Sequence, residues 1–213
     1  MRITVFGAAG NVGSRVVAEA LARGHEVTAV VRDSARFADL HPDAVHRVGN
    51  AAHVEDVVAL TTGQDLAIGA TRPAPGSEAG LLAATSGLLA GAERTGVRLL
   101  LVGGAGSLTV PGADGLTVVD TPDFPASWRP IARACGEQLD AALAAPASVD
   151  WAYLSPAAVL EPGVRTGRYR VGVDELIVDA EGNSSVSMED LAVALVDEAE
   201  RPKHHRMRFT VGY

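Results

Sequence analysis

Cysteine, aromatic residues and long apolar runs are all scarce in this sequence. With Cys135 as its one cysteine among 213 residues, the chain cannot form an internal disulfide bond. No run of about 18 or more apolar residues occurs. The apolar stretch at the N-terminus is too short for a signal peptide. These absences predict a cytoplasmic protein without a membrane segment.

Positive charge is also in short supply. The 18 Lys and Arg residues face 26 Asp and Glu residues, so the formal net charge is −8. An acidic protein gains nothing from counterion release on nucleic acid, which argues against DNA and RNA as partners. Aromatic residues make up 4% of a chain that is 47% hydrophobic, so Ala, Val and Leu must fill the core. This composition suits helices packed on a buried parallel sheet.

Short apolar runs alternate with helical patterns along most of the chain. Strands are predicted where β-branched or aliphatic residues run together, at 2–7, 25–33, 44–50, 65–71, 97–106 and 149–157. Helices are predicted where apolar residues recur at helical spacing, at 11–24, 53–63, 77–96, 125–147 and 186–200. Pro125 suits a helical first turn, and so does Pro130 if the helix starts later. The alternation predicts an α/β fold with a doubly wound, Rossmann-like parallel sheet.

The last part of the chain departs from this alternation. Residues 167–172 and 174–182 are predicted to pair as two short strands, and 207–213 to form a terminal strand. Ser187 precedes Asp190 by three residues, as in a helix cap. We expect one domain over residues 1–213, in which about 155–185 form a cap at the carboxyl edge of the sheet.

Three glycines follow the first predicted strand and open the first predicted helix. In Gly7-Ala8-Ala9-Gly10-Asn11-Val12-Gly13, the first glycine allows a tight turn and the second lets a pyrophosphate approach the backbone. The third lets the helix pack close to the sheet. The helix N-terminus then offers free N–H groups and the positive end of its dipole. The stretch therefore predicts nucleotide binding, although a simple packing turn would also need such glycines.

The residues after the second predicted strand bear on the choice of nucleotide. A ribose 2′-hydroxyl is usually bound by an acidic residue there, whereas a 2′-phosphate needs positive charge. Arg32 and Arg36 can pair with a 2′-phosphate and Ser34 can donate a hydrogen bond, while Asp33 keeps NAD(H) possible. The sequence therefore favours NADP(H) over NAD(H).

The G-x-x-G-x-x-G spacing and the residues up to Phe37 resemble the atypical short-chain dehydrogenases, in particular the NmrA-like and biliverdin-IXβ (flavin) reductase-like proteins. The segments 99–108, 150–172 and 208–213 resemble a bacterial branch of the same group, so the resemblance covers nearly the whole chain. It implies an NAD(P)H-binding oxidoreductase.

The resemblance also implies a set of cofactor contacts at strand carboxyl ends. Around the pyrophosphate these are the three glycines with Ala9, Asn11 and Val12; at the 2′-phosphate, Arg32 and Arg36; at the adenine, Asn50 and Ala51, where Asp is commoner at position 50; at the ribose, Gly69, Ala70 and Thr71; at the nicotinamide, Gly103, Gly104 and the loop up to Ser107; and at the carboxamide, Ser155, Pro156 and Ala157.

The usual catalytic pair of short-chain dehydrogenases is missing. These enzymes place a Tyr and a Lys four residues apart on the helix after the fifth strand, where Tyr is the general acid. Residues 125–147 contain neither, and Trp128, Arg129 and Arg133 are not equivalent proton donors. Ser107 is the candidate catalytic residue, either polarising a carbonyl or capping its loop. Tyr153 alternates with Trp151 in a strand, which favours core packing over catalysis.

Three functions remain open from the sequence. The first is NADPH-dependent reduction of a small aromatic, quinone or flavin-like acceptor, with solvent as proton source; the second is a non-catalytic NADP(H)-sensing regulator of NmrA type; the third is an isomerase or lyase.

No metal site is predicted, because the histidines lack ligand spacing, and the chain could be a monomer or a homodimer. The loop 107–125 and the segment 160–179 are expected to enclose an apolar substrate pocket, with candidate lining residues Leu108, Val110, Phe124, Trp128, Val159 and Leu160.

Overall fold

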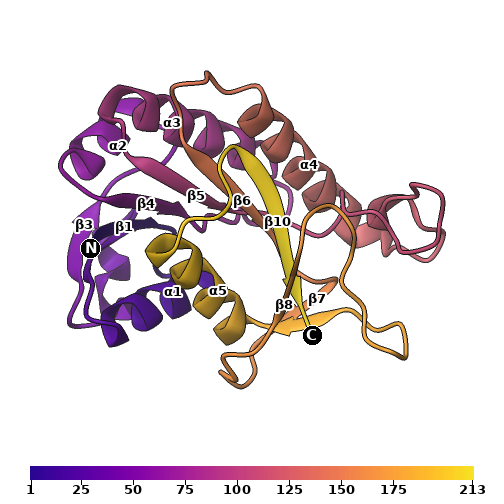
Figure 1. The fold of residues 1–213 in the computed structure, drawn as a ribbon. Helices are drawn as coiled ribbons and strands as arrows, with labels where there is room; N and C mark the ends of the chain where they lie inside the picture. The colour runs from indigo at the N-terminus through magenta and orange to yellow at the C-terminus, as the bar shows by residue number, and fades with distance from the viewer.

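An eight-stranded sheet forms the middle layer of the computed structural model, which describes residues 1–213 (Figure 1). From one edge to the other its strands are β3 (Val45–Val48), β2 (Glu26–Val31), β1 (Arg2–Phe6), β4 (Leu66–Gly69), β5 (Arg98–Val102), β6 (Trp151–Ser155), β10 (Met207–Gly212) and β8 (Arg170–Gly172). All neighbours are parallel except β10 and β8. The strand order reverses between β1 and β4, which is where ligands bind in open α/β sheets. The predicted doubly wound fold is confirmed.

Helices cover both faces of this sheet (Figure 1). One face carries α1 (Asn11–Ala22) and α5 (Met188–Glu200), and the other carries α2 (Val54–Thr61), α3 (Ala79–Thr95) and α4 (Arg129–Leu143). Two separate apolar cores result, because strand side chains alternate between the faces. None of the helices combines the length and the apolar character that crossing a membrane requires.

Trp151 and Tyr153 both lie in the core on the α4 side of the sheet, with 0% of their surface exposed. Residues two apart in a strand share a face, so the two rings pack on the same side rather than one on each. The Tyr153 hydroxyl donates to the Cys135 carbonyl at 2.8 Å, and burial raises the pKa of this phenol above its usual value. Core packing, as favoured from the sequence, is what the structure has.

The helix after β5 starts later than its first proline. A short 3₁₀ turn, η3 (Ala126–Trp128), follows Pro125, and α4 begins at Arg129 with Pro130 in its first turn. The missing N–H of a proline costs nothing at this position. At α5 the predicted cap is confirmed, since the Ser187 hydroxyl accepts from the Asp190 N–H at 3.0 Å.

The segment between β6 and α5 differs most from expectation. Residues 174–182 form no strand, so the predicted pairing with 167–172 is wrong, and β8 pairs instead with β10. The main chain of residues 174–176 forms hydrogen bonds with Thr109 instead, so that 174–182 has only an isolated bridge to Thr109. The short strands β7 (Val159–Glu161) and β9 (Ser185–Ser187) form a separate parallel pair that was not predicted.

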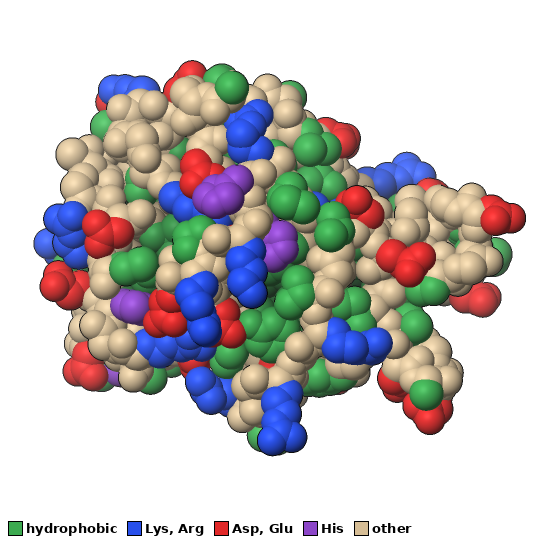
Figure 2. All heavy atoms as spheres, in the orientation of Figure 1, with side chains coloured by type: hydrophobic (Ala, Val, Ile, Leu, Met, Phe, Trp, Pro, Cys, Tyr) green, Lys and Arg blue, Asp and Glu red, His purple; other side chains and the backbone are tan.

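Residues 163–169 lie along α1 and α5, where positive and negative side chains are interspersed on the surface (Figure 2). The Arg165 guanidinium holds both oxygens of Glu19 at 2.7 and 2.8 Å, and Glu19 is 7% exposed. Asp190 accepts from the N–H groups of Thr166 and Gly167, each at 2.8 Å. This part of the expected cap is thus bound to the outer side of two helices.

Candidate functional site

The turn between β1 and α1 needs glycine at three positions. Gly7 has a φ of 80°, and a Cβ there would lie 2.4 Å from the Ala70 carbonyl oxygen. A Cβ on Gly13 would lie 2.1 Å from the Gly7 carbonyl oxygen, and one on Gly10 would lie 3.1 Å from the same atom. The glycines therefore let β1, β4 and the first turn of α1 meet at the point where the strand order reverses.

The first turn of α1 presents unused hydrogen-bond donors. The main-chain N–H groups of Asn11, Val12 and Gly13 donate to no protein atom, and Gly10 has no side chain to cap them. The first turn of α1 contains no acidic residue that would repel an anion. Free N–H groups at a helix N-terminus, next to a turn kept open by glycine, fit the pyrophosphate of a dinucleotide.

A cluster of polar residues follows β2 at the same edge of the sheet. Arg32 is exposed and has neither an ion pair nor a side-chain hydrogen bond, and Ser34 is exposed as well. Arg36 forms an ion pair with Asp39 and also donates to the Ala9 carbonyl at 3.3 Å, so it reaches the glycine turn. One Asp33 carboxylate oxygen accepts from the Ala35 N–H at 2.9 Å and thereby caps the 3₁₀ helix η1 (Ser34–Asp39).

The residues expected at the adenine are largely engaged within the chain. The Asn50 side-chain oxygen accepts from the Ala52 N–H at 3.1 Å, and its amide nitrogen lies 3.3 Å from His53 Nε2. Ala51 is 5% exposed and packs in the core with α3. The Asn50 side-chain oxygen thus takes part in the turn into α2, and the adenine contacts expected of Asn50 and Ala51 stay predictions.

At the ends of β4 and β5, glycines make room for neighbouring side chains. A Cβ on Gly69 would lie 2.8 Å from Leu88 Cδ1, and one on Gly103 would lie 1.9 Å from Tyr153 Cζ. Gly104 lies against Cys135, and burial raises the pKa of that thiol to about 11, so it is not an activated nucleophile. Ala70 is buried, and Thr71 is the residue after β4 that keeps exposed surface at the expected ribose position.

Ser107 has a partner that sequence reasoning missed. Arg208, on β10, donates to the Ser107 hydroxyl at 2.9 Å and to its carbonyl at 3.2 Å. The same guanidinium pairs with Asp174 at 2.5 Å, and the Arg208 side chain is 10% exposed. Only the three-dimensional arrangement brings these residues together, because they are separated by 101 and 34 positions along the chain.

The residues expected at the carboxamide are covered. Ser155 and Ala157 are 0% and 1% exposed and Pro156 is also buried, so none of the three presents surface to a ligand in this conformation. Leu108, an expected pocket-lining residue, is likewise 0% exposed. These four positions are thus covered in the structure, and the contacts expected there stay predictions.

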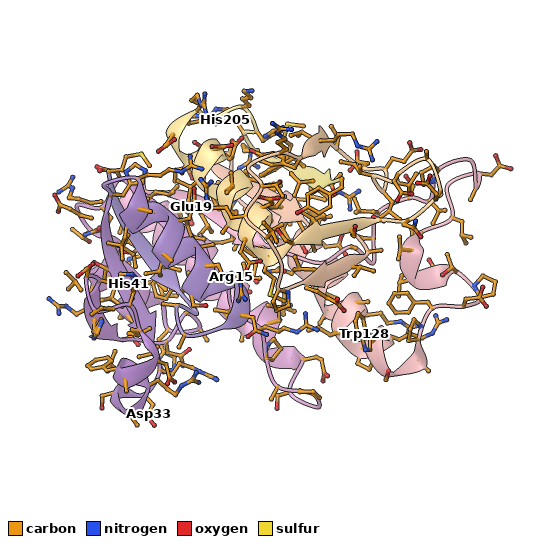
Figure 3. All side chains as sticks on the ribbon, turned by 90° about the horizontal axis from the view of Figure 1, so that it is seen from below. Arg15, Glu19, Asp33, His41, Trp128 and His205 are labelled. Carbon is orange, nitrogen blue, oxygen red and sulfur yellow. The ribbon has the colours of Figure 1, made fainter.

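α4 contains no tyrosine or lysine, and the residues near the expected positions make other contacts. Arg129 donates to the Val119 carbonyl at 2.8 Å and lies over the Phe124 ring, while Arg133 is exposed on the outer side of α4. Trp128 is 57% exposed. Figure 3 shows Trp128 and Asp33 at the same edge of the molecule and His205 at the opposite edge.

One hollow in the surface, of about 640 Å³, lies away from the glycine turn, between Thr109, Pro111 and residues 170–178. A second, of about 310 Å³, lies beside β7, β9 and Tyr213. No group of three or more His, Cys, Asp or Glu side chains is arranged to hold a metal ion.

Comparisons with known proteins agree with this geometry. Residues 7–202 match a family model described as NAD(P)H-binding. The chain is 40% identical over 217 residues to YwnB of Bacillus subtilis (strain 168), covering 99% of this chain and 98% of the relative. A Bacteroides thetaiotaomicron structure, provisionally named an epimerase, is 41% identical with a TM-score of 0.90, covering 100% and 96% of the two chains. SP1627 of Streptococcus pneumoniae TIGR4, provisionally named an NADH-flavin reductase, is 30% identical with a TM-score of 0.86, covering 100% and 99%.

Proposed function

The chain belongs to the NAD(P)H-binding family, and from this premise we propose that it is an NADPH-dependent oxidoreductase that reduces a small aromatic, quinone or flavin-like acceptor. When bound, the cofactor supplies the hydride, and the protein holds and orients the two reactants. The observation that carries the proposal is the set of free N–H groups on Asn11, Val12 and Gly13 beside an unpaired Arg32.

The preference for NADPH rests on how the residues after β2 are used. Asp33 would be the partner of a ribose 2′-hydroxyl, but one of its oxygens already caps η1. Arg32 and Ser34 are exposed and free, and Arg36 approaches the turn through Ala9. A 2′-phosphate would gain charge-assisted hydrogen bonds there. The second oxygen of Asp33 leaves one acceptor for a ribose 2′-hydroxyl, and the pneumococcal relative is provisionally named an NADH-flavin reductase. We therefore expect NADH to serve as a poorer cofactor.

Reduction without the Tyr–Lys pair is consistent with an acceptor whose ring takes the hydride directly. Quinones and flavins can then take their proton from solvent. The exposed indole of Trp128, on the cofactor edge of the sheet, would give such a ring a surface on which to stack.

The test is NADPH oxidation with FMN, FAD and menadione as acceptors. We expect turnover with at least one of them and a higher kcat/KM for NADPH than for NADH. In Arg32→Glu, kcat/KM for NADPH should fall roughly 10- to 100-fold, the value of one hydrogen bond to a charged group. Arg168→Glu is the matched control, since Arg168 is also exposed and unpaired and the change in charge is the same. Tight NADPH binding with no turnover on any acceptor would refute the reductase.

Two observations support other functions on the same fold. The missing Tyr–Lys pair fits an NADP(H)-sensing regulator, which would bind cofactor without turnover and bind a protein partner in only one redox state of the cofactor. The 41% identical relative provisionally named an epimerase fits an isomerase, which would leave the amount of NADPH unchanged while interconverting its substrate.

A further inference from the structure

Two hydroxyl groups, one at the end of β6 and one within β10, are buried without a partner. Ser155 and Thr210 are each 0% exposed and lie opposite one another in the β6–β10 register. Neither Ser155 Oγ nor Thr210 Oγ1 makes a hydrogen bond. Buried Thr85 differs, because its hydroxyl donates to the Leu81 carbonyl at 2.9 Å. An unpaired buried hydroxyl is costly and rare in folded proteins, so a pair of them requires an explanation.

The two hydroxyls lie on the α4 side of the sheet. Side chains two apart in a strand share a face, so Ser155 lies on the side of Tyr153, and Thr210 on the side of Arg208. Tyr153 packs in the core under α4. Ser155 is the last residue of β6, next to β5 and the loop expected to face the nicotinamide.

Apolar side chains from two distant segments close over this region. Ile177 lies against Gly172 and Gly212, and Gly172 lies against the Thr210 methyl group. Leu108 is fully buried but belongs to neither apolar core. Its neighbour Ser107 is held by Arg208, which fixes Leu108 at the same end of the sheet.

Residues 107–110 and 174–177, here called the flap, are joined to each other. The Thr109 N–H donates to the Asp174 carbonyl at 2.9 Å, and the Leu176 N–H donates to the Thr109 carbonyl at 2.8 Å. Arg208 binds both parts through Ser107 and Asp174. The 640 Å³ hollow is lined by Thr109 and by residues of the second part, among them Ile177.

We propose that the flap opens to admit the acceptor, and that Ser155 and Thr210 donate hydrogen bonds to its carbonyl oxygens. The acceptor class is then a planar molecule that carries ring carbonyl groups, as quinones and flavins do. Leu108 and Ile177 supply apolar surface for its ring. This inference rests on the proposed reductase function and names the part of the acceptor that is recognised.

Thr210→Val tests the site, because it removes the hydroxyl and keeps the shape of the side chain. Losing an unpaired buried hydroxyl should raise Tm by about 2–4 °C. The kcat/KM for FMN and menadione should fall about fivefold to tenfold, whereas that for methylene blue, a planar acceptor without carbonyl oxygens, should stay unchanged. Ser155→Ala should act in the same direction. If FMN turnover is unchanged, or falls together with that of methylene blue, the assignment is wrong.

Thr61→Val is the matched control. Thr61 is 1% exposed, and its hydroxyl donates to the Val57 carbonyl at 2.8 Å on α2. Its replacement should lower Tm and leave turnover of all acceptors unchanged. Equal effects of Thr61→Val and Thr210→Val on Tm would contradict the claim that the Thr210 hydroxyl is unpaired.

Binding of FMN without NADPH, followed by its fluorescence, separates this inference from the reductase. If FMN binds more weakly to Thr210→Val although no variant oxidises NADPH, the carbonyl site stands and the reductase fails. If FMN binds equally to the wild type and to Thr210→Val, or to neither, the site is refuted even when the wild type reduces other acceptors. Hydrogen exchange at the Thr109 and Leu176 amides should speed up when FMN binds, and unchanged exchange would contradict flap opening.

Discussion

A single added methyl group at Gly13 is expected to damage both stability and cofactor binding. Its Cβ would lie 2.1 Å from the Gly7 carbonyl oxygen and 2.8 Å from the Gly7 carbonyl carbon. Both are main-chain atoms of the cofactor turn, so no side chain can move aside. The turn and α1 must separate by about 0.9 Å to restore a 3.0 Å contact. Crowding of this kind costs about 1–3 kcal/mol, partly offset by the roughly 0.5–1 kcal/mol that alanine gains over glycine in a helix.

The net loss for Gly13→Ala is therefore up to about 2.5 kcal/mol, which corresponds to a fall in Tm of up to about 10 °C for a chain of this size. Gly136→Ala is the control, because Gly136 lies in α4 and no atom comes within 4 Å of its Cβ. That variant should gain about 0.5–1 kcal/mol. Thermal unfolding, with and without NADPH, measures both effects. If Gly13→Ala is as stable as Gly136→Ala and NADPH protects it as well as it protects the wild type, the account of the turn is refuted.

Two further predictions concern residues away from the cofactor. Tyr153→Phe removes the hydroxyl that donates to the Cys135 carbonyl. The free energy of unfolding in urea should fall by about 1–2 kcal/mol, and the pH profile of kcat should not change. If one limb of that pH profile disappears, Tyr153 is a proton donor instead. Hydrogen bonds from Arg165 hold the pKa of the Glu19 carboxyl below its usual range, so their stabilisation is present above the ordinary carboxyl pKa and is lost as pH falls through the lowered folded value. Arg165→Met should therefore lower the stability slightly at pH 7, since Arg23 still pairs with Glu19, and progressively less toward pH 3; an equal loss at both pH values would contradict this.

The parts of the fold predicted from sequence are those set by local pattern. The parallel strands and their helices follow from apolar periodicity and from the glycine turn, which need no knowledge of distant residues. The strands β7, β8 and β9 have three residues each. β7 pairs with β9 and β8 with β10, and Thr109 bonds residues 174–176, so each of these contacts joins segments that are far apart in the chain. For that reason residues 174–182 were wrongly predicted as a strand.

In the candidate site, too, the features set by neighbouring residues were predictable and those set by distant residues were not. Free N–H groups at α1 and an exposed Arg32 follow from neighbouring residues, so the sequence could indicate them. Ser155 and Thr210 lie opposite one another on strands that are far apart in the chain, and the partner of Ser107 lies 101 residues away. No spacing rule predicts such contacts, which is why Arg208 and Thr210 were missed.

Calorimetric titration of wild type, Arg32→Glu and Arg168→Glu with NADPH and NADH tests the central claim most directly. We expect the wild type and Arg168→Glu to bind NADPH more tightly than NADH. Arg32→Glu should lose about 10- to 100-fold in NADPH affinity and change little toward NADH. If Arg32→Glu binds NADPH as tightly as the wild type does, the 2′-phosphate does not lie beside Arg32 and the assignment of NADPH is wrong.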